Sequence, residues 1–323
     1  MSLVLIAVTF IVFCISVSVG DFPIPLRDVV PAIFNHGSAE ADFIVQTLRL
    51  PRALTALLVG AAFGISGSVF QLLARNPLAS PDIIGITSGA SASAVFMIVV
   101  LGATSTSVSI GALIGSLITA VAIYLLARKQ GVSSYRLVLV GIAVAAVLDA
   151  VVSYLLTRAE IMDAQRAAVW LTGSLNGRSW DHVRPMVLAM AVLLPAIVAL
   201  SRPLRGLQLG DDTATGIGVR VEWSKAALII VAVGLCAIAT ASAGPITFLA
   251  FVAGPIARRL CGGSDLALLP AALVGALLLL LSDLIARRLF APTELPVGVV
   301  TGVLGAPYLL WLLARSNRAG RAG

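Results

Sequence analysis

The segment Arg49–Ala90, RLPRALTALLVGAAFGISGSVFQLLARNPLASPDIIGITSGA, decides the fold. Between Arg52 and Arg75 it contains no charged residue. At about 1.5 Å of rise per residue, that interval is long enough to cross a hydrocarbon core of about 30 Å. Pro51 stands at the start of the uncharged run, where its fixed φ suits the first turn of a helix. The segment therefore predicts a transmembrane helix over residues 53–74.

The composition of the 323 residues agrees with a lipid environment. Hydrophobic residues make up 59% of the chain, charged residues only 11%, and the mean hydropathy is +1.05. Soluble domains carry about 25% charged residues, so this chain cannot hide its apolar surface in water. We predict an all-α polytopic membrane protein that forms one transmembrane domain over residues 1–323. About ten apolar runs, each with at most two charged residues, predict its spans, at residues 2–20, 53–74, 86–103, 107–127, 136–156, 183–200, 225–243, 246–257, 266–286 and 296–314.

The eighth run is short and contains Gly254 and Pro255, so we expect a broken or re-entrant helix there. The first run lacks basic residues at its start and a small-residue cleavage site, so we interpret it as a retained helix.

The basic residues predict the orientation of the chain. If ten spans alternate, thirteen of the 22 lysines and arginines fall on one side, which should be cytoplasmic. Both termini then lie in the cytoplasm. The positive net charge follows from this bias, and nothing in the pattern indicates a nucleic acid. The thirteen residues are Arg75, Arg128, Lys129, Arg136, Arg202, Arg205, Arg220, Lys225, Arg258, Arg259, Arg315, Arg318 and Arg321.

Motifs for catalysis, nucleotide hydrolysis and metal binding are missing from the sequence. A phosphate-binding loop needs Gly-Lys followed by Ser or Thr, but the only two lysines, Lys129 and Lys225, follow Arg and Ser. No Gly-x-Ser-x-Gly or His-Glu-x-x-His motif is present. The three cysteines and two histidines are scattered, so we expect neither a metal site nor a cofactor, and no enzyme activity in this chain.

Three segments between the spans are too long or too patterned for simple turns. Residues 76–90 contain two prolines and two glycines that predict a rigid re-entry into the membrane. Residues 203–222 predict two short amphipathic helices on the cytoplasmic side, which would either lie on lipid or dock into a partner protein. Residues 160–182 predict a short outer helix and loop with Trp170 and Trp180 at the interface.

Motifs distributed over almost the whole chain resemble one family. The chain is similar to the FecCD family, the permease subunits of type II ABC importers for ferric siderophores, haem and cobalamin. The matching residues are Leu50-Pro51-Arg52, Gly67, Gln71, Asn76-Pro77-Leu78-Ala79, Pro81, Gly85, Gly89-Ala90, Leu209-Gly210-Asp211, Ala214, Gly218, Gly244-Pro245-Ile246, Ser282-Asp283, Glu294-Leu295-Pro296, Gly298 and Gly305-Ala306-Pro307.

The resemblance implies the fold of these permeases and a set of partners. A second permease chain would form the pathway together with this one, near spans 136–156 and 296–314 and the short helix at 163–177. Two ATP-binding subunits would supply energy, and a periplasmic or lipid-anchored binding protein would deliver the substrate. Residues 249–258 and 170–177 look like the siderophore branch, which favours a ferric siderophore and a heterodimer over cobalamin or haem. The location implied is the bacterial cytoplasmic membrane.

The resemblance also assigns roles to particular residues. Arg49, Arg52 and Arg287 match arginines that pair with glutamates of the binding protein, a role that suits exposed guanidinium groups at an outer rim. From the residues alone, Arg49 and Arg52 could equally anchor lipid headgroups. The segment that docks into the ATP-binding subunit matches Leu209, Gly210, Asp211, Ala214 and Gly218.

Three further residues are candidates for the substrate pathway: Asp149, Gln71 and Asn176. Asp149 lies in the middle of the fifth span, where a carboxylate is costly unless it is protonated, paired or wetted. It therefore lines a path, pairs with the partner permease, or makes a local packing contact. A different class of protein, a proton-coupled secondary transporter, would use Asp149 and Asp283 as proton carriers. The family implies instead a structural role for Asp283.

Overall fold

The computed structural model describes residues 1–20, 22, 24–34, 36–128, 134–262 and 266–319, and it consists of helices joined by short connections. The elements are α1 (Ser2–Ser18), α2 (Leu26–Ile33), α3 (Ala39–Phe43), the π-helical η1 (Ile44–Arg49), α4 (Leu50–Ala74), α5 (Ile86–Val99), α6 (Ser105–Ala127), α7 (Ser134–Arg158), α8 (Ile161–Thr172), α9 (Trp180–Ala199), α10 (Ser201–Gln208), α11 (Asp211–Gly216), α12 (Val221–Ala243), α13 (Leu249–Leu260), α14 (Leu268–Arg288) and α15 (Val297–Ala319).

Ten of these helices correspond in order to the ten predicted spans, namely α1, α4, α5, α6, α7, α9, α12, α13, α14 and α15. Six helical segments in the described part of the chain are long and apolar enough to cross a membrane, and α1, α5 and most of α15 are shorter apolar helices. The prediction of an all-α polytopic membrane protein is confirmed. α13 is continuous through Gly254 and Pro255, but its 12 residues are too few to cross about 30 Å.

The centre of the molecule is α4, which packs against α9, α12, α13 and α14. Close approach requires small residues on its surface. Any side chain at Gly64 would collide with the backbone of Ala271 on α14, and any side chain at Gly67 would collide with Ala250 on α13. Because apolar helices in lipid gain little from hydrophobic burial, such van der Waals contact between backbones is what holds them together. α4 is thereby fixed along its length.

The connection from α4 to α5 passes into the helix bundle. Gly85 has a φ of +84° and lies against the backbone of Gly141 on α7, where a larger residue would clash. Gly141 lies within α7, about two turns from its start, so the chain has entered the bundle before α5 begins. This arrangement explains why α5 has only 14 residues. The connection thus turns back into the bundle before α5, and a re-entry of residues 76–90 into the membrane stays a prediction.

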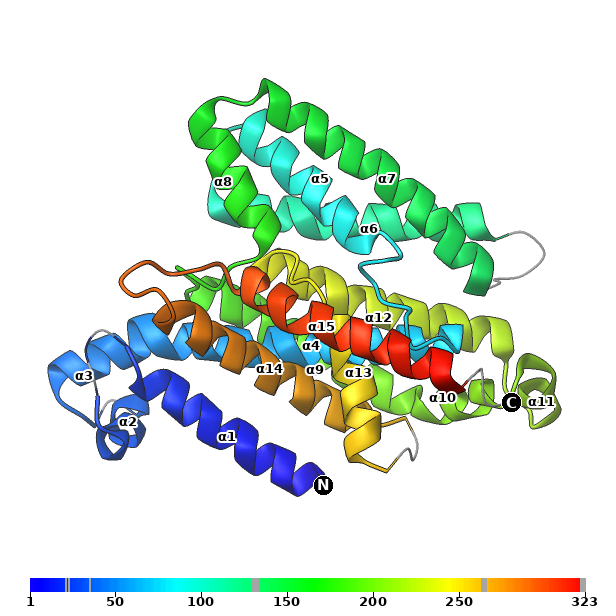
Figure 1. Ribbon diagram of the computed structural model, residues 1–323, viewed down its shortest axis with the longest axis horizontal. Helices are drawn as coiled ribbons and strands as arrows, with labels where there is room; N and C mark the ends of the chain where they lie inside the picture. The colour runs from blue at the N-terminus through cyan, green and yellow to red at the C-terminus, as the bar shows by residue number, and fades with distance from the viewer. Residues whose placement is uncertain (21, 23, 35, 129–133, 263–265, 320–323) are drawn as a thin grey trace.

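The helices run roughly lengthwise in Figure 1, so the molecule has two ends. One end carries α2, α3, α8 and the loop between α14 and α15, and we call it the α8 end. The opposite end carries α10 and α11, and we call it the α11 end. α4 runs from the first end to the second.

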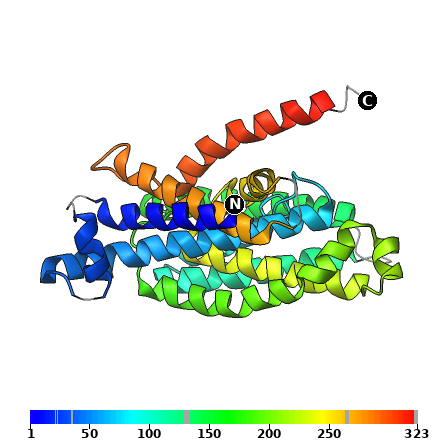
Figure 2. The same cartoon turned by 90° about the horizontal axis from the view of Figure 1, so that it is seen from below.

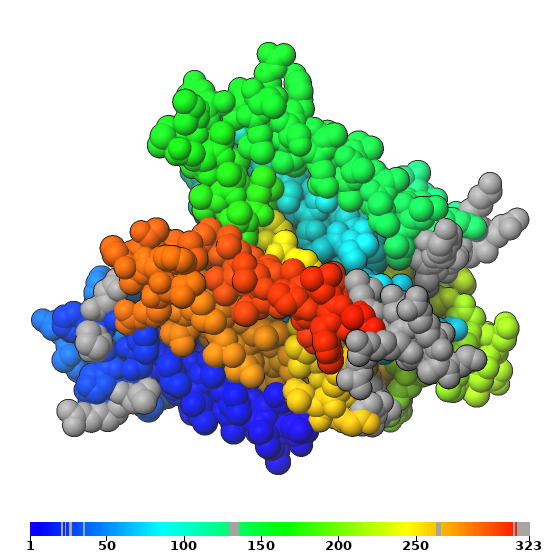
Figure 3. Space-filling view, viewed as in Figure 1, coloured from blue at the N-terminus to red at the C-terminus, as the bar shows by residue number. Residues whose placement is uncertain are grey.

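α7 and α15 flank an open face of the molecule, and α8 lies beside α7 (Figure 1). α7 and α8 lie above a furrow and α15 lies below it, as the space-filling view shows (Figure 3). Part of α15 projects away from the body (Figure 2). Both helices expose large apolar side chains, including Val147 and Val151 on α7 and Val303 and Leu310 on α15.

Candidate functional site

A cavity of about 750 Å³ opens at the α8 end, and we call it the α8 cavity. α8 supplies one wall with Gln165, Arg166 and Trp170. The loop after α8 contributes Asn176 and Arg178, and the loop before α15 contributes Glu294, Leu295 and Pro296. The predicted outer helix and loop thus form much of a mouth large enough for a small molecule.

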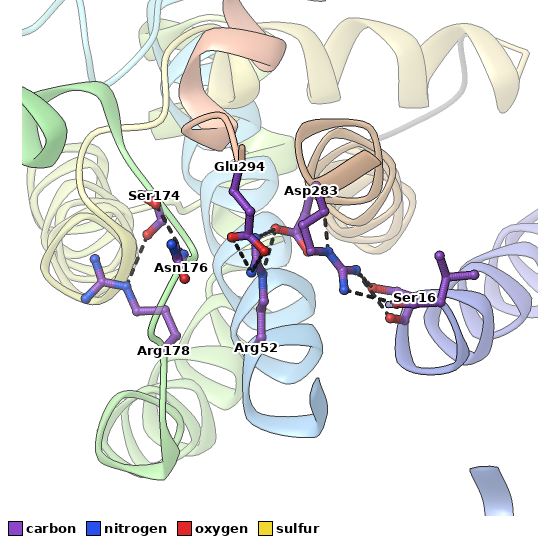
Figure 4. A network of polar contacts seen from close by, with 9 residues as sticks. Ser16, Arg52, Ser174, Asn176, Arg178, Asp283 and Glu294 are labelled. Carbon is purple, nitrogen blue, oxygen red and sulfur yellow. Dashed lines mark hydrogen bonds and ion pairs between the residues drawn. The ribbon is translucent and has the colours of Figure 1, made fainter. Parts of the chain in front are cut away.

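A buried ion-pair network lies beside this cavity, and we call it the Asp283 network (Figure 4). Arg52, near the start of α4, donates two hydrogen bonds to Asp283 Oδ1, from Nε at 3.0 Å and from Nη2 at 2.9 Å. Its Nη1 reaches Glu294 Oε2 at 2.9 Å and Oε1 at 3.2 Å. The Asp283 side chain is 0% exposed, so its charge is stabilised by its arginine partners rather than by water.

Arg287 extends the Asp283 network to the first helix. Its Nε lies 3.1 Å from Asp283 Oδ2, and its Nη2 donates to Ser16 Oγ at 2.7 Å and to Ser16 O at 3.2 Å. The side chains of Arg52 and Arg287 are each 11% exposed. The network therefore joins α1, α4, α14 and the loop before α15 at one end of the bundle.

Arg49 is also buried, with 8% of its surface exposed. Its guanidinium group donates to the carbonyl oxygens of Val17, at 3.1 Å, Ser18, at 2.7 Å, and Phe22. The first two of these carbonyls belong to the last turn of α1, which attracts a cation because its carbonyls lack partners within the helix. The expectation of exposed guanidinium groups is wrong for Arg49, Arg52 and Arg287, because internal carbonyls and carboxylates satisfy all three.

A second group of ion pairs lies at the α11 end. Asp211, the first residue of α11, binds Lys225 of α12 through Oδ2 at 2.5 Å and Arg75 through Oδ1 at 3.3 Å. Arg75 also donates to Leu207 O at 3.0 Å. Arg75 follows directly after α4, so Asp211 connects α11 to both α4 and α12. Unlike Asp283, Asp211 and Arg75 are about half exposed.

The remaining residues of the predicted docking segment divide into packed and exposed positions. Ala214 is fully buried, whereas Leu209 is 64% exposed and Ile217 is 61% exposed. Gly210 and Gly218 have positive φ values, of +111° and +86°, and mark the two turns that bound α11. The segment consequently presents two large apolar side chains outward from a fixed turn structure.

The three predicted pathway residues fall in different surroundings. Asn176 lines the α8 cavity. Asp149 is exposed on α7, and with Ser153 and Thr157 it forms an exposed polar stripe at four-residue spacing. Gln71 is buried, donates to Phe251 O at 2.9 Å and accepts from Arg258 Nη2 at 2.9 Å. Its side chain therefore belongs to the packing between α4 and α13.

Sequence reasoning did not single out three residues that the structure places in or beside the furrow. Arg178 and Glu294 line the α8 cavity, and Asp82 lines a second cavity of about 410 Å³ together with Phe248 and Leu309. Each stands in a loop whose course only the tertiary structure defines. Glu294 did belong to a quoted family motif, but nothing in the motif indicates a partnership with Arg52.

The geometry defines a class of protein: a helical membrane permease with a cavity at one end and a short helix that exposes Leu209 and Ile217 at the other. The family model of the FecCD transport family matches residues 8–315. The chain belongs to the FecCD transport family, and it is a multi-pass membrane protein.

Curated relatives and a solved structure resemble the chain over nearly its full length. It is 42% identical to the ferric enterobactin transport system permease protein of Escherichia coli (strain K12), over 93% of this chain and 91% of the relative. It is 38% identical to the iron(3+)-hydroxamate import system permease protein of Bacillus subtilis (strain 168), over 98% of both chains. A structure described as an inward-facing conformation of a metal-chelate type ABC transporter matches with a TM-score of 0.82 and 29% identity, covering 97% of this chain and 98% of that chain.

Proposed function

We propose that this chain is a permease subunit of an ATP-driven importer that moves a ferric siderophore across the bacterial cytoplasmic membrane. The main support is full-length similarity to permeases whose names specify ferric enterobactin and iron-hydroxamate transport. The α8 cavity, which opens beside the furrow, fits a substrate of small-molecule size.

The α11 end faces the cytoplasm in this proposal, and the α8 end faces outward. The cluster of Arg202, Arg205, Arg220, Arg258 and Arg259 supports this orientation, because cytoplasmic loops carry the excess of basic residues. Both chain termini are then cytoplasmic.

Two ATP-binding subunits would supply energy from the cytoplasm, since this sequence lacks the phosphate-binding motif. The docking surface would be centred on the exposed side chains of Leu209 and Ile217. A helix with exposed apolar anchors is suited to a groove in a partner. Asp211, Gly210, Ala214 and Gly218 would hold that surface in place from behind.

A second permease would complete the pathway along the furrow, and a heterodimer is favoured. The polar stripe of Asp149, Ser153 and Thr157 supports this arrangement. A carboxylate on an exposed helix face is costly in lipid, so the stripe should face water or a partner chain. Asp149 and Asn176 are then pathway residues of this chain.

A binding protein would dock at the α8 end. Arg52 is the best placed of the three predicted arginines, because its partner Glu294 is 32% exposed on a loop at the surface. A carboxylate of the binding protein could replace Glu294 on Nη1 of Arg52, while Nε and Nη2 stay bound to Asp283. Arg49 and Arg287 would support the site from within.

ATP-dependent uptake in proteoliposomes tests the proposed function. The vesicles would hold this chain with its partner permease and ATP-binding subunits, and they would be supplied with ⁵⁵Fe-labelled ferric siderophore with and without binding protein. We expect uptake only with internal ATP and with binding protein. Uptake driven by a proton gradient alone, without ATP, would instead assign the chain to the proton-coupled secondary transporters, with Asp149 as the carrier.

A further inference from the structure

We propose that Arg178, with Asn176 and Gln165 beside it, forms an anion-binding position in the wall of the α8 cavity, and that this position favours negatively charged ferric chelates. The inference rests on the proposed function and narrows its substrate class. The residues come from α8 and from the loop that follows it, and the cavity brings them together.

The charges around the cavity are paired except at Arg178. Glu294 is neutralised by Arg52 at 2.9 Å, and Arg166 has Asp163 at 3.3 Å. Arg178 donates through Nε to Ser174 O at 3.1 Å and through Nη1 to His182 Nε2 at 2.9 Å, and both acceptors are uncharged. Within the described residues no carboxylate lies within 4 Å of Arg178. The cavity wall therefore carries one positive charge without a counterion.

The donor groups of Arg178 are also not all in use. The hydrogen bonds of its guanidinium group to Ser174 and His182 occupy Nε and Nη1, and among the described residues Nη2 has no hydrogen-bond acceptor. Ser174 holds the loop in shape by accepting from the backbone N–H of Asn176 at 3.1 Å (Figure 4). The exposed amide side chains of Asn176 and Gln165 add neutral donors on the same wall.

Burial makes this charge a stronger attractor for an anion. Arg178 is only partly exposed, and burial lowers its pKa to about 10, so the guanidinium group stays protonated at neutral pH. A cation that has lost part of its hydration gains more from an incoming anion than a fully solvated one does. Its fixed donors suit phenolate or carboxylate oxygens, which occur at the surface of tris-catecholate and citrate chelates of iron.

The test measures uptake of a trianionic ⁵⁵Fe(III) tris-catecholate by the complete transporter, reconstituted with its binding protein. The variants are Arg178→Gln, which removes the positive charge, and Arg178→Lys, which retains it. Arg184→Gln is the matched control, because Arg184 is exposed on α9 and does not line the cavity. ATP hydrolysis stimulated by the empty binding protein is measured in parallel, because it reports assembly and docking without the chelate.

We expect Arg178→Gln to lower uptake by about tenfold or more, the loss typical of one charge-assisted hydrogen bond. Arg178→Lys and Arg184→Gln should retain most of the uptake, and stimulated ATP hydrolysis should be unchanged in all three variants. Equal uptake in Arg178→Gln and wild type would overturn the inference. So would equal losses in the Gln and Lys variants, or ATP hydrolysis that falls together with uptake, since either result indicates a structural role.

Failure of the inference can be distinguished from failure of the proposed function. If the wild-type transporter takes up an uncharged ferric tris-hydroxamate with ATP but not the tris-catecholate, the anion position is wrong and the importer stands. If neither chelate is taken up in an ATP-dependent manner, the proposed function itself fails.

Discussion

The two ends of α4 use the same chemistry, an arginine bound to an aspartate, in opposite surroundings. At the α8 end, Arg52 pairs with Asp283, whose side chain is 0% exposed. At the α11 end, Arg75 pairs with Asp211, and these two side chains are 51% and 49% exposed. Removing one partner of a buried pair leaves an uncompensated charge, whereas water replaces a lost partner at the surface. One end of α4 is therefore held rigidly by a buried ion pair, and the other end is held by an exposed ion pair that can break and re-form.

This difference matches what an importer requires of its two faces. In the proposed importer, the α11 end would follow movements of an ATP-binding partner, and the exposed pair of Asp211 with Arg75 would re-form at little cost. The α8 end would keep the cavity wall in shape while α4 transmits those movements as a rigid element. Four predictions test the comparison.

Asp283→Asn should produce the largest effect. It removes the charge that Arg52 and Arg287 share, and breaking a buried pair typically costs about 3–5 kcal/mol. The thermal unfolding midpoint of the purified protein in detergent should fall markedly. The control is Asp163→Asn, which removes a partly exposed pair with Arg166 on α8. Equal midpoints for the two variants would mean that the Asp283 network does not lock the α8 end.

Leu209→Asp combined with Ile217→Asp should break the function of the α11 end without unfolding it. Both side chains are exposed, so the free energy of unfolding should hardly change. Loss of two apolar anchors at the centre of an interface should weaken binding of the ATP-binding subunit by at least about tenfold. Co-purification of that subunit measures the effect. Gly216→Ala is the control, because nothing lies within 4 Å of the added methyl group. Retained co-purification in the double variant would exclude this docking surface.

Asp211→Asn should have a modest effect. The pair with Arg75 lies at the surface, and Asp211 is 49% exposed although Lys225 is only 11% exposed. Because water can replace the lost partner at the exposed carboxylate, the free energy of unfolding should fall by about 1 kcal/mol. Because Asp211 connects α11 to α4 and α12, uptake per ATP hydrolysed should fall by about two- to threefold. The ratio of ⁵⁵Fe uptake to phosphate release gives this number. A loss of stability as large as that of Asp283→Asn would remove the distinction between the two ends.

Asp149→Asn should have the smallest effect on folding. The carboxylate is exposed on α7 and has no ion-pair partner in the described residues, so the unfolding midpoint should not fall. In the pathway proposal, uptake nevertheless changes, by about twofold or more, because the stripe loses its charge where the substrate passes. If uptake is unchanged in Asp149→Asn, Asp149 does not line the pathway, and its role is a local packing contact.

Much of this fold could be predicted from the sequence, because the lipid bilayer requires a long apolar segment wherever the chain crosses it. Apolar runs identified ten helices, and the prolines and glycines of residues 76–90 predicted that the chain turns back before α5. The short helix α11 also lies within the predicted range 203–222, and α10 begins two residues before that range. Such features depend on local sequence and on hydropathy, which the chain displays directly.

The partners of the arginines could not be predicted in the same way. Arg52 and Asp283 are 231 residues apart, and Arg49 finds its acceptors in the last turn of α1 and in the segment after it, 27 to 32 residues earlier. A span-by-span analysis places these arginines at a membrane surface but cannot show which helix ends meet there. For the same reason it missed Arg178 and Glu294, whose shared cavity exists only after α8 and the loop before α15 come together.

Hydrogen–deuterium exchange of the complete transporter, with and without ATP, tests the difference between the two ends of α4 most directly. We expect backbone amides of residues 50–55 and 283–287 to stay protected in both states, because the Asp283 network and the surrounding packing hold them. Amides of residues 209–217 should exchange quickly and change their protection when ATP binds. Rapid exchange at residues 50–55 together with unchanging protection at residues 209–217 would contradict the account.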